Sequence, residues 1–437
     1  MSKHCVSVTV AGGIAGIALC TTAYADFLSD SKANLGFRNL YYNNDNRDGT
    51  AAPSKTEEWA QGFMLDYKSG FTDGTIGVGL DALGLMGVRL DSGKGRHVGS
   101  SMIPSDSDDR AVDEWSRLGL TGKVRLSKTE LRYGTLLPKL PILVYSDGRV
   151  LPQTFEGAQV TSHEFENVTF VAGQIEHATG RGSTDATGLA VSGGTMESNK
   201  FDFAGGDWKI TKNLTAQYYY AKLEDYYRQH FVGVLHTFPI AEGQAIKTDL
   251  RYFKTDADGA NDAGQVGYRT SGFTRNGDGR IDNDTWSAAF TYTFGAHALL
   301  GGYQSVSDDS NFVQMSQGGL PDKGAGGNSL YLYTDRLIQS FNRAGERTAF
   351  TQYSYDFAAL GAPGLKASVM YLKGTDIKTT SGDDQKEWER DFSLDYVIQS
   401  GTMQGLGFAW RNGVSRSEAS RDQDQNRFTV SYSIPLL

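Results

Sequence analysis

The sequence predicts an all-β protein, a transmembrane antiparallel β-barrel of about eighteen strands with an inward-folded third long loop. Apolar and polar residues alternate along most segments, as in strands with one apolar face. Short turns and long polar loops also follow each other in alternation. The 437 residues include 53 Gly, 22 Tyr and 22 Phe, yet mean hydropathy is −0.40. A membrane barrel has such a composition because its outer face alone is apolar.

The alternation is clearest in three segments. Residues 285–295, TWSAAFTYTFG, place their aromatic side chains, Phe290 among them, on one face and Thr291 on the other. Residues 406–413 and 426–437 alternate in the same way. These patterns predict strands with one apolar and one polar face, and we expect the apolar face to meet lipid.

Turns of two sizes separate these strands. The short turns are Ser127-Lys128, Glu166-Asn167, Thr211-Lys212-Asn213, Gly295-Ala296 and Gly361-Ala362-Pro363-Gly364. The long loops are rich in Asp, Gly, Ser and Asn and include residues 91–110, 255–280 and 307–329. Outer-membrane barrels have short periplasmic turns and longer extracellular loops. An even number of strands would place both chain ends on the periplasmic side.

The first 25 residues are typical of a secretory signal peptide. Lys3 precedes the short apolar run 6–19, and Ala23-Tyr24-Ala25 has the form of a cleavage site. A buried core helix is the alternative interpretation. Removal of residues 1–25 would leave residues 26–437 as one barrel domain.

The composition of the remaining chain excludes several classes of protein. Both cysteines, Cys5 and Cys20, lie in the signal segment, so no disulfide is expected in the exported chain. It keeps 41 Lys and Arg against 51 Asp and Glu, a net charge of −10 that argues against nucleic acid as a partner. No apolar run reaches about 18 residues, so no transmembrane helix is expected.

One loop, residues 138–153, is unusual because it is both apolar and rich in proline. Pro138, Pro141 and Pro152 exclude a regular helix or a central strand. About eighteen strands would leave an aqueous lumen rather than a packed core. We therefore expect this loop to fold inward, constrict the pore and turn Arg149 toward the permeation path. The alternative is that Arg149 pairs with Asp147 or a wall carboxylate and holds the loop in place.

Other basic residues are expected on the lumenal faces of strands, because a charge facing lipid would cost about 2–4 kcal/mol at the midplane. Several cations in a narrow channel raise the local concentration of anions. Alternatively, neighbouring carboxylates such as Glu130 and Asp395 neutralise them. We expect Arg411 and Arg427 near the extracellular ends of their strands. The candidates are Lys123, Arg125, Arg132, Lys366, Arg411 and Arg427.

Several stretches carry a family resemblance: EEWAQGFMLDYKSGFTDGTIGVGLDALGLMGVRLDSGKG, SRLGLTGKVRLSKTELRYGTLLPKLP, GRVLPQTFEG, LEDYYRQ, APGL, DYVIQSG and YSIPLL. They spread over nearly the whole chain after residue 25, which resembles the outer-membrane porin D (OprD-like) family of substrate-specific porins. The resemblance implies an 18-stranded barrel that takes up small solutes, often carboxylates, past a ladder of lumenal Arg and Lys. It also implies a pore narrowed by the third long loop.

The chain departs from the family pattern at a few positions. The family's penultimate strand usually carries two alternating lumenal arginines, whereas this chain has Ala409 and Arg411. Met370 stands where the family often has an arginine. Ile338 and Ser340 stand where members that take up basic amino acids have a tyrosine and an aspartate. These differences argue against cationic substrates and weaken the anion preference.

The expected function is passive uptake of small solutes, small carboxylates above all, across the outer membrane of a Gram-negative cell. The alternative is a general or structural outer-membrane barrel without strong substrate preference. The expected partners are small solutes and outer-membrane lipid, the expected state is a monomer or a weak homotrimer, and no cofactor or metal is expected. Which solute passes is not encoded in any motif.

An enzymatic function finds little support in the sequence. His163, His177 and His297 have no serine motif nearby. Asp225 could take part in acid–base chemistry, but no nucleophile or metal-binding set accompanies it. A buried clamp between Asp225 and Arg228 is the expected arrangement.

Overall fold

The computed structural model describes residues 27–50, 53–93, 95–97, 100–318 and 327–437. The predicted signal peptide, residues 1–25, lies outside the described residues. The helical segments of the described residues include α2 (Gly259–Asp262), η1 (Val266–Tyr268) and η2 (Phe357–Leu360), and residues 27–29 are helical as well. None of the helices in the described part of the chain is long and apolar enough to cross a membrane.

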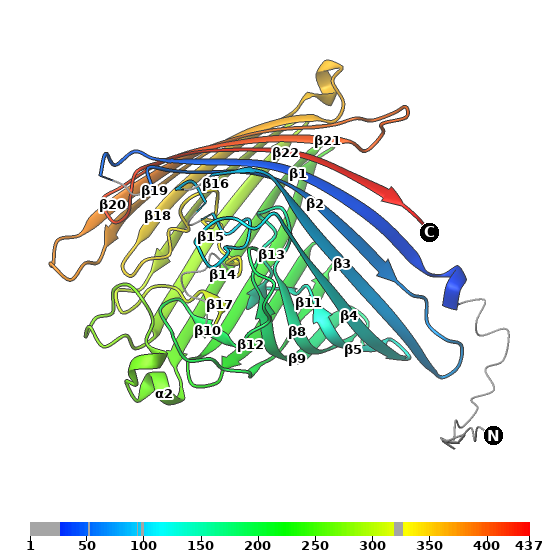
Figure 1. The fold of residues 1–437 in the computed structure, drawn as a ribbon, viewed down its shortest axis with the longest axis horizontal. Helices are drawn as coiled ribbons and strands as arrows, with labels where there is room; N and C mark the ends of the chain where they lie inside the picture. Colours follow the sequence, from blue (N-terminus) through cyan, green and yellow to red (C-terminus); the bar gives the residue numbers. More distant parts are fainter. Residues whose placement is uncertain (1–26, 51–52, 94, 98–99, 319–326) are drawn as a thin grey trace, which may run out of the picture.

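The fold is a closed barrel of 18 antiparallel strands (Figure 1). Closure follows from the pairing of β1 (Lys32–Asn46) with both β2 (Lys55–Lys68) and β22 (Gln423–Pro435). The chain ends of the described barrel therefore meet at one seam. The predicted fold class and strand number are confirmed.

Each wall strand pairs with the one before and after it, so the barrel is a continuous meander. The strands between β2 and β22 are β3 (Ile76–Ser92), β4 (Glu114–Leu126), β5 (Thr129–Leu136), β8 (Thr154–Ser162), β9 (Val168–Thr179), β11 (Phe201–Thr211), β12 (Leu214–Leu223), β13 (Tyr227–Ala241), β14 (Gln244–Ala257), β15 (Asp282–Phe294), β16 (His297–Val306), β18 (Arg347–Asp356), β19 (Leu365–Ile377), β20 (Gln385–Val397) and β21 (Gly407–Ser417). Four short strands belong to loops: β6 (Lys139–Leu140), β7 (Leu143–Val144), β10 (Leu189–Val191) and β17 (Met315–Gln317).

The two faces of the wall follow the predicted alternation. In β15, Trp286 and Phe290 are 46% and 51% exposed on the outer face. Thr285 and Ser287, one position out of phase, are buried at 0% and 3% exposure. The strands thus place apolar side chains outward, where lipid replaces water, and polar side chains inward.

The two ends of the barrel differ in their connections. Ser127, Asn167 and Gly295 have positive φ values of 54°, 65° and 56°, as tight hairpin turns require. These turns lie at the end of the barrel that also holds both ends of the described chain. Most connections at the opposite end are long, but residues 224–226 and 418–422 are short.

The expected clamp between Asp225 and Arg228 is wrong. Arg228 is exposed, whereas the Asp225 carboxylate accepts a hydrogen bond from the backbone N–H of Ala260 at 3.2 Å. The buried Tyr226 hydroxyl donates to the carbonyl oxygen of Met196 and so joins two loops. The Tyr226 side chain thus joins loops at this corner, and Glu224 forms an ion pair of 3.3 Å with Lys200 rather than Asp225 with Arg228.

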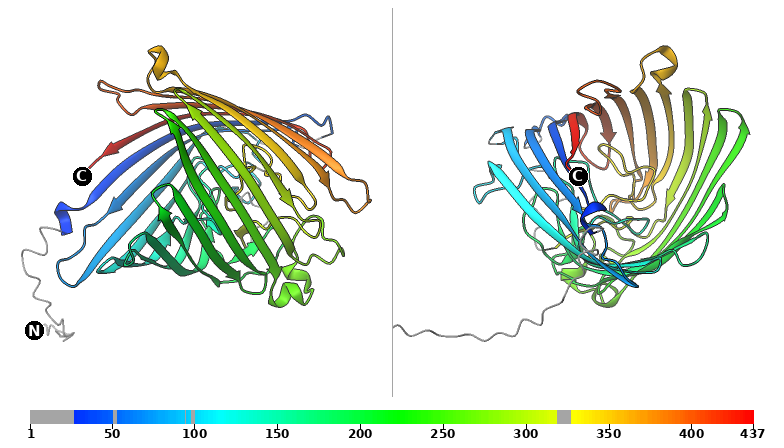
Figure 2. Two further views of the ribbon diagram at one scale, coloured as in Figure 1. Left: turned by 180° about the vertical axis from the view of Figure 1, so that it is seen from behind. Right: turned by 90° about the vertical axis from the view of Figure 1, so that its right-hand side faces the viewer.

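The loop of residues 137–153, loop 3, starts part-way up the wall because its flanking strands are short. β5 has 8 residues and β8 has 9, whereas β3 has 17. Pro138 follows soon after β5 and cannot continue the hydrogen-bond ladder. Loop 3 folds into the barrel (Figure 2), where Val150 and Leu151 are fully buried against the wall at Gly62.

Two further loops join loop 3 inside the barrel. Loop 4, residues 180–200, contributes β10, which pairs with β17 of loop 7, residues 307–346. An isolated bridge between Val144 and Ser329 links loop 3 to loop 7. Arg251 of β14 fixes loop 7 to the wall, because its guanidinium lies 3.9 Å and 4.2 Å from the ring centres of two loop 7 residues, Tyr331 and Tyr333. Backbone pairing and aromatic contacts therefore fix these loops to one another and to the wall.

The face assignment predicts opposite outcomes for neighbouring substitutions in β15. Phe290→Arg would place a charge against lipid, at a cost of up to about 2–4 kcal/mol at the midplane and less near the interface. Thr291→Arg would place the same charge on the lumenal face. We expect Phe290→Arg to lower the yield of heat-modifiable, folded barrel on gel electrophoresis, and Thr291→Arg to fold normally and alter conductance. Equal folding yields for the two variants would contradict the assignment.

Candidate functional site

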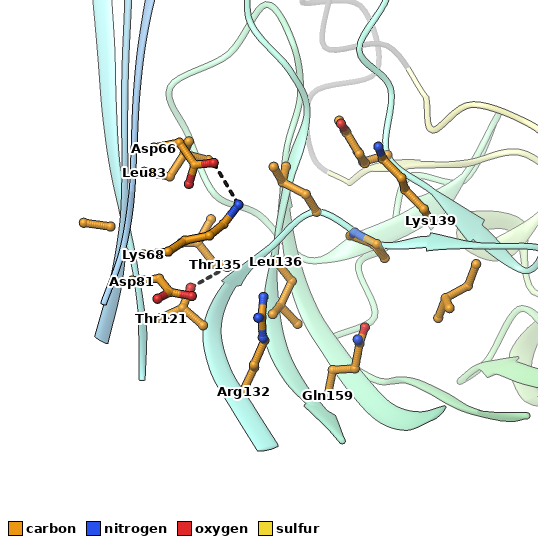
Figure 3. Close-up of a pocket in the computed structure, with 15 residues that line it drawn as sticks. Asp66, Lys68, Asp81, Leu83, Thr121, Arg132, Thr135, Leu136, Lys139 and Gln159 are labelled. Carbon is orange, nitrogen blue, oxygen red and sulfur yellow. Dashed lines mark hydrogen bonds and ion pairs between the residues drawn. The ribbon is translucent and has the colours of Figure 1, made fainter. Parts of the chain in front are cut away.

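A cavity of about 480 Å³ lies beneath loop 3, on the side toward both chain ends, and is called the periplasmic-side cavity (Figure 3). Asp66 and Lys68, neighbours on the same face of β2, line one side of it and form an ion pair of 2.9 Å. Arg132 also lines it, but its guanidinium is paired with Glu130, as the alternative interpretation anticipated. The charges in this cavity are therefore largely compensated.

Lys123 and Arg125 of β4 also contact neighbouring side chains. The Lys123 ammonium lies 2.6 Å from the Asp81 carboxylate and is 5% exposed. The Arg125 guanidinium stacks over the ring of Phe71 at 4.2 Å from its centre. Lys123 thus has a carboxylate partner on the adjacent strand, one that sequence spacing did not indicate.

Lys366 and Arg411 have carboxylate partners as well. The Lys366 ammonium lies 3.2 Å from Asp356, near the end of the barrel with the short turns. Arg411 pairs with Asp395 at 2.6 Å, the partner considered in the sequence analysis. Arg411 is the fifth residue of the 11-residue β21 and lies opposite Arg427 in the register, so the expected positions of both near the extracellular ends are wrong. Arg411 lies in the middle of its strand.

Arg427 and Arg149 meet at the barrel seam. Arg427 on β22 lies opposite Tyr42 on β1 in the register, and its guanidinium is 5.7 Å from the centre of the Tyr42 ring. The Arg149 guanidinium of loop 3 lies 4.6 Å from the centre of the same ring. The buried tyrosine therefore holds two cations that come from different elements.

Arg149 does not pair with Asp147. That carboxylate forms an ion pair of 2.7 Å with Arg38 of β1, which also donates to the carbonyl oxygen of Arg149 at 2.8 Å. The Arg149 side chain instead donates from Nε to the carbonyl oxygen of Ser100 at 2.8 Å. Arg38 thus fixes the backbone of loop 3, and the Arg149 charge is left without a carboxylate among the described residues.

A third arginine, Arg181 of loop 4, completes this group and was not among the candidates from sequence. A methyl group at Gly148 would lie 3.6 Å from Nη1 of Arg181 and 3.7 Å from Nη1 of Arg427. Burial and the charges of Arg149 and Arg427 lower the pKa of Arg181 to about 9, so it stays charged at neutral pH. We call Arg149, Arg181 and Arg427 the arginine cluster.

The arginine cluster differs from the other cations in its partners. Within the described part of the chain, none of its three guanidinium groups forms an ion pair with a carboxylate; Arg149 and Arg427 donate to carbonyl oxygens, and Arg427 also to an amide. The Nε atom of Arg181 is buried without a hydrogen-bond partner among those residues. Buried polar groups are normally satisfied, so this N–H is an exception within the described part of the chain.

Two cavities adjoin the arginine cluster. One, of about 460 Å³, is lined by Arg149 and by amide side chains of β1 and β22, and is called the amide cavity. The other, of about 240 Å³, is lined by Asp335, Asp391 and Arg411, and is called the carboxyl cavity. Leu337 of loop 7 lines both, and its carbonyl oxygen accepts a hydrogen bond of 2.6 Å from Arg427. Arg427 therefore contacts a residue that lines both cavities.

Loop 7 brings a carboxyl group to the site despite Ile338 and Ser340. Asp335 accepts hydrogen bonds from the Ser340 hydroxyl and the Leu330 N–H, both at 2.8 Å. Burial raises the pKa of Asp335. Loop 7 thus brings a carboxyl group, Asp335, and a guanidinium group, Arg336, to the carboxyl cavity, which the departures at Ile338 and Ser340 alone did not indicate.

The chain was compared with known proteins. It matches the outer membrane porin, OprD family, over residues 25–436. Porin D of Pseudomonas aeruginosa is 34% identical, with 100% of this chain and 99% of that protein covered. The porin-like protein GalP of Pseudomonas putida is 35% identical, with 94% of this chain and 93% of that protein covered.

Solved structures of outer-membrane porins are similar to this chain as well. The crystal structure of Pseudomonas aeruginosa OccK8 (OprE) superposes with a TM-score of 0.87 at 48% identity, covering 94% of this chain and 100% of that one. The BenF-like porin from Pseudomonas fluorescens Pf-5 gives a TM-score of 0.85 at 35% identity, with the same shares covered. These relatives are channels of the outer membrane of Gram-negative bacteria, which is where this barrel resides. The closed 18-strand fold, the full-length match and these identities show that the chain belongs to the OprD family of outer membrane porins.

Proposed function

We propose that the chain is a selective porin through which small carboxylates diffuse without energy coupling, past the arginine cluster at a constriction formed by loop 3. The observation that carries this proposal is the set of three guanidinium groups around Gly148 without a carboxylate ion pair among the described residues. A carboxylate passing there gains charge-assisted hydrogen bonds from guanidinium groups that pair with no carboxylate among the described residues.

The magnitude of the attraction suits a channel. Two unit charges about 4 Å apart attract by about 1 kcal/mol in water and about 4 kcal/mol at an effective dielectric of 20. Even the lower value raises local anion occupancy several-fold, since about 1.4 kcal/mol corresponds to a factor of ten. Conduction also requires that the solute leave, and such contacts dissociate readily.

A relative supports the substrate class. Pseudomonas aeruginosa OpdK, whose structure with vanillate was solved, is 35% identical to this chain with a TM-score of 0.82. Vanillate is a small carboxylate, so a barrel of this shape accommodates that chemistry in OpdK.

The second candidate function is a barrel without strong solute preference. It is favoured by the ion pairs that neutralise Lys123, Arg132, Lys366 and Arg411. The two functions differ in whether the arginine cluster controls ion selectivity, and this is measurable.

Alanine at each position of the arginine cluster tests the proposal. Arg149→Ala, Arg181→Ala and Arg427→Ala should each shift the reversal potential under a KCl gradient toward cation selectivity and lower monocarboxylate uptake into proteoliposomes several-fold. Arg411→Ala is the matched control, because it removes the same charge from a wall position paired with Asp395. We expect a smaller shift for this control. Unchanged reversal potentials in all three cluster variants would favour the non-selective barrel.

A carboxylate introduced at Gly148 should mimic a permanently bound solute. Gly148→Glu would place its charge among the guanidinium groups, where it competes with permeating anions. We expect lower carboxylate flux and a cation-shifted reversal potential, whereas Gly148→Gln, which is similar in size and uncharged, should keep the wild-type selectivity. Equal selectivity of the two variants would show that charge at this position does not control permeation.

A further inference from the structure

The amide cavity has a lining that a simple carboxylate does not require. Asn44 and Asn46 of β1 lie directly opposite Gln425 and Gln423 of β22 in the register of the seam. All four side chains line the cavity, together with Arg149. Three of the four are buried, with exposures of 6% for Asn44, 9% for Asn46 and 3% for Gln425. We call these four residues the amide cluster.

Hydrogen bonds within the amide cluster fix the orientation of its side chains. The Asn46 Oδ1 accepts from Asn44 at 3.3 Å and from Gln423 at 3.0 Å. Gln425 donates to Asn44 Oδ1 and to the Tyr42 hydroxyl, both at 3.1 Å. The Arg427 Nε donates to Gln425 Oε1 at 2.6 Å, so the amide cluster is continuous with the arginine cluster.

These bonds leave donors and acceptors of both kinds unused among the described residues. A carboxamide offers two N–H donors and an oxygen with two lone pairs. Asn44 uses one donor and one acceptor position, and Gln423 uses one donor. The four residues line a cavity of about 460 Å³, within the about 300–1,000 Å³ typical of small-molecule sites.

The chemistry of the solute follows from this mixture. A hydroxyl group both donates and accepts, so neighbouring hydroxyls match an array of carboxamides. An alkyl or aromatic surface would leave those polar groups without partners, and a site built to bond hydroxyls discriminates strongly against an analogue that lacks them. A carboxylate accepts but does not donate, and Arg149 and Arg421, which both line the cavity, are its possible partners.

The adjoining cavities lack the array of four carboxamides, although Leu337 and Ile338 of loop 7 also add apolar surface to the amide cavity. Leu136, Leu137 and Leu140 line part of the periplasmic-side cavity. The carboxyl cavity is lined by charged groups, Asp335, Asp391 and Arg411 among them. The array of carboxamides next to an arginine belongs to the extracellular side of the arginine cluster, where an incoming solute arrives first.

We propose that the amide cavity binds polyhydroxylated monocarboxylates, the sugar acids, and selects them over unsubstituted carboxylates of the same length before they reach the arginine cluster. The inference rests on the proposed carboxylate function and narrows its substrate class. Arg149 holds the carboxylate, and the amide cluster holds the hydroxyl groups of the chain.

The test compares gluconate with hexanoate, which have the same number of carbons and the same charge. Uptake of each acid is measured in proteoliposomes that contain purified barrel, for wild type and for Gln423→Met. Methionine keeps the length of the side chain and removes its hydrogen-bonding groups. Gln352→Met is the matched control, because Gln352 lines the carboxyl cavity and bonds Ser354 there.

We expect wild type to take up gluconate several-fold faster than hexanoate, and this ratio to fall several-fold in Gln423→Met but not in Gln352→Met. In single-channel recording, extracellular gluconate should interrupt the current for shorter times in Gln423→Met than in wild type. Folding of each variant is checked by its heat-modifiable mobility on gel electrophoresis. Asn44→Leu supplies a second variant of the amide cluster.

Two outcomes would overturn the inference: equal uptake of the two acids by wild type, or an unchanged ratio in both Gln423→Met and Asn44→Leu. The proposed carboxylate function is tested separately, by a different variant. Arg149→Ala should lower uptake of both acids and keep their ratio, and if it lowers neither, the carboxylate function is wrong whatever the ratio shows.

Discussion

Closure of the sheet at the β1–β22 seam is the constraint on which the rest of this structure depends. Backbone N–H and C=O groups cannot stay unpaired in hydrocarbon, so a sheet that spans a membrane has to close. The register of the seam places Tyr42 opposite Arg427, and Asn44 opposite Gln425. A shift of one residue would turn these side chains toward lipid. The pairing that makes the barrel stable in the membrane therefore also assembles its candidate site.

The site needs, besides the seam, loops that enter the barrel at a fixed height. The short strands β5 and β8 let loop 3 leave the wall early, and Val150 and Leu151 anchor it by apolar burial. The ion pair between Arg38 and Asp147 then fixes the loop next to Gly148. With the loop anchored independently of Arg149, the charge of that arginine is not needed to hold the fold. Like charges gathered in this way are costly, and carbonyl oxygens and the Tyr42 ring offset part of the cost.

Much of this architecture could be predicted from the sequence, because it follows from periodicity. The alternation around Phe290 predicted which face of the wall is apolar, and the tight turns predicted which strands pair as hairpins. The register between strands has no such signal in the sequence. The pairing of Lys123 with Asp81 therefore could not be predicted, although both residues lie on lumenal faces. Arg181 was missed for a related reason. Gly-Arg dipeptides also occur at Gly95-Arg96 and Gly279-Arg280, outside the site, so the dipeptide alone does not identify Arg181.

The central claim is that the space beside Gly148 lies on the permeation path and is positively charged. The cysteines of the chain are Cys5 and Cys20, both in the predicted signal peptide, so Gly148→Cys would give the exported barrel one thiol. Single-channel recording during exposure to methanethiosulfonates measures both properties at once. The account predicts a stepwise fall in conductance and faster modification by the negatively charged ethylsulfonate reagent than by the positively charged trimethylammonium reagent. Modification without a change in conductance, or faster modification by the cationic reagent, would contradict it.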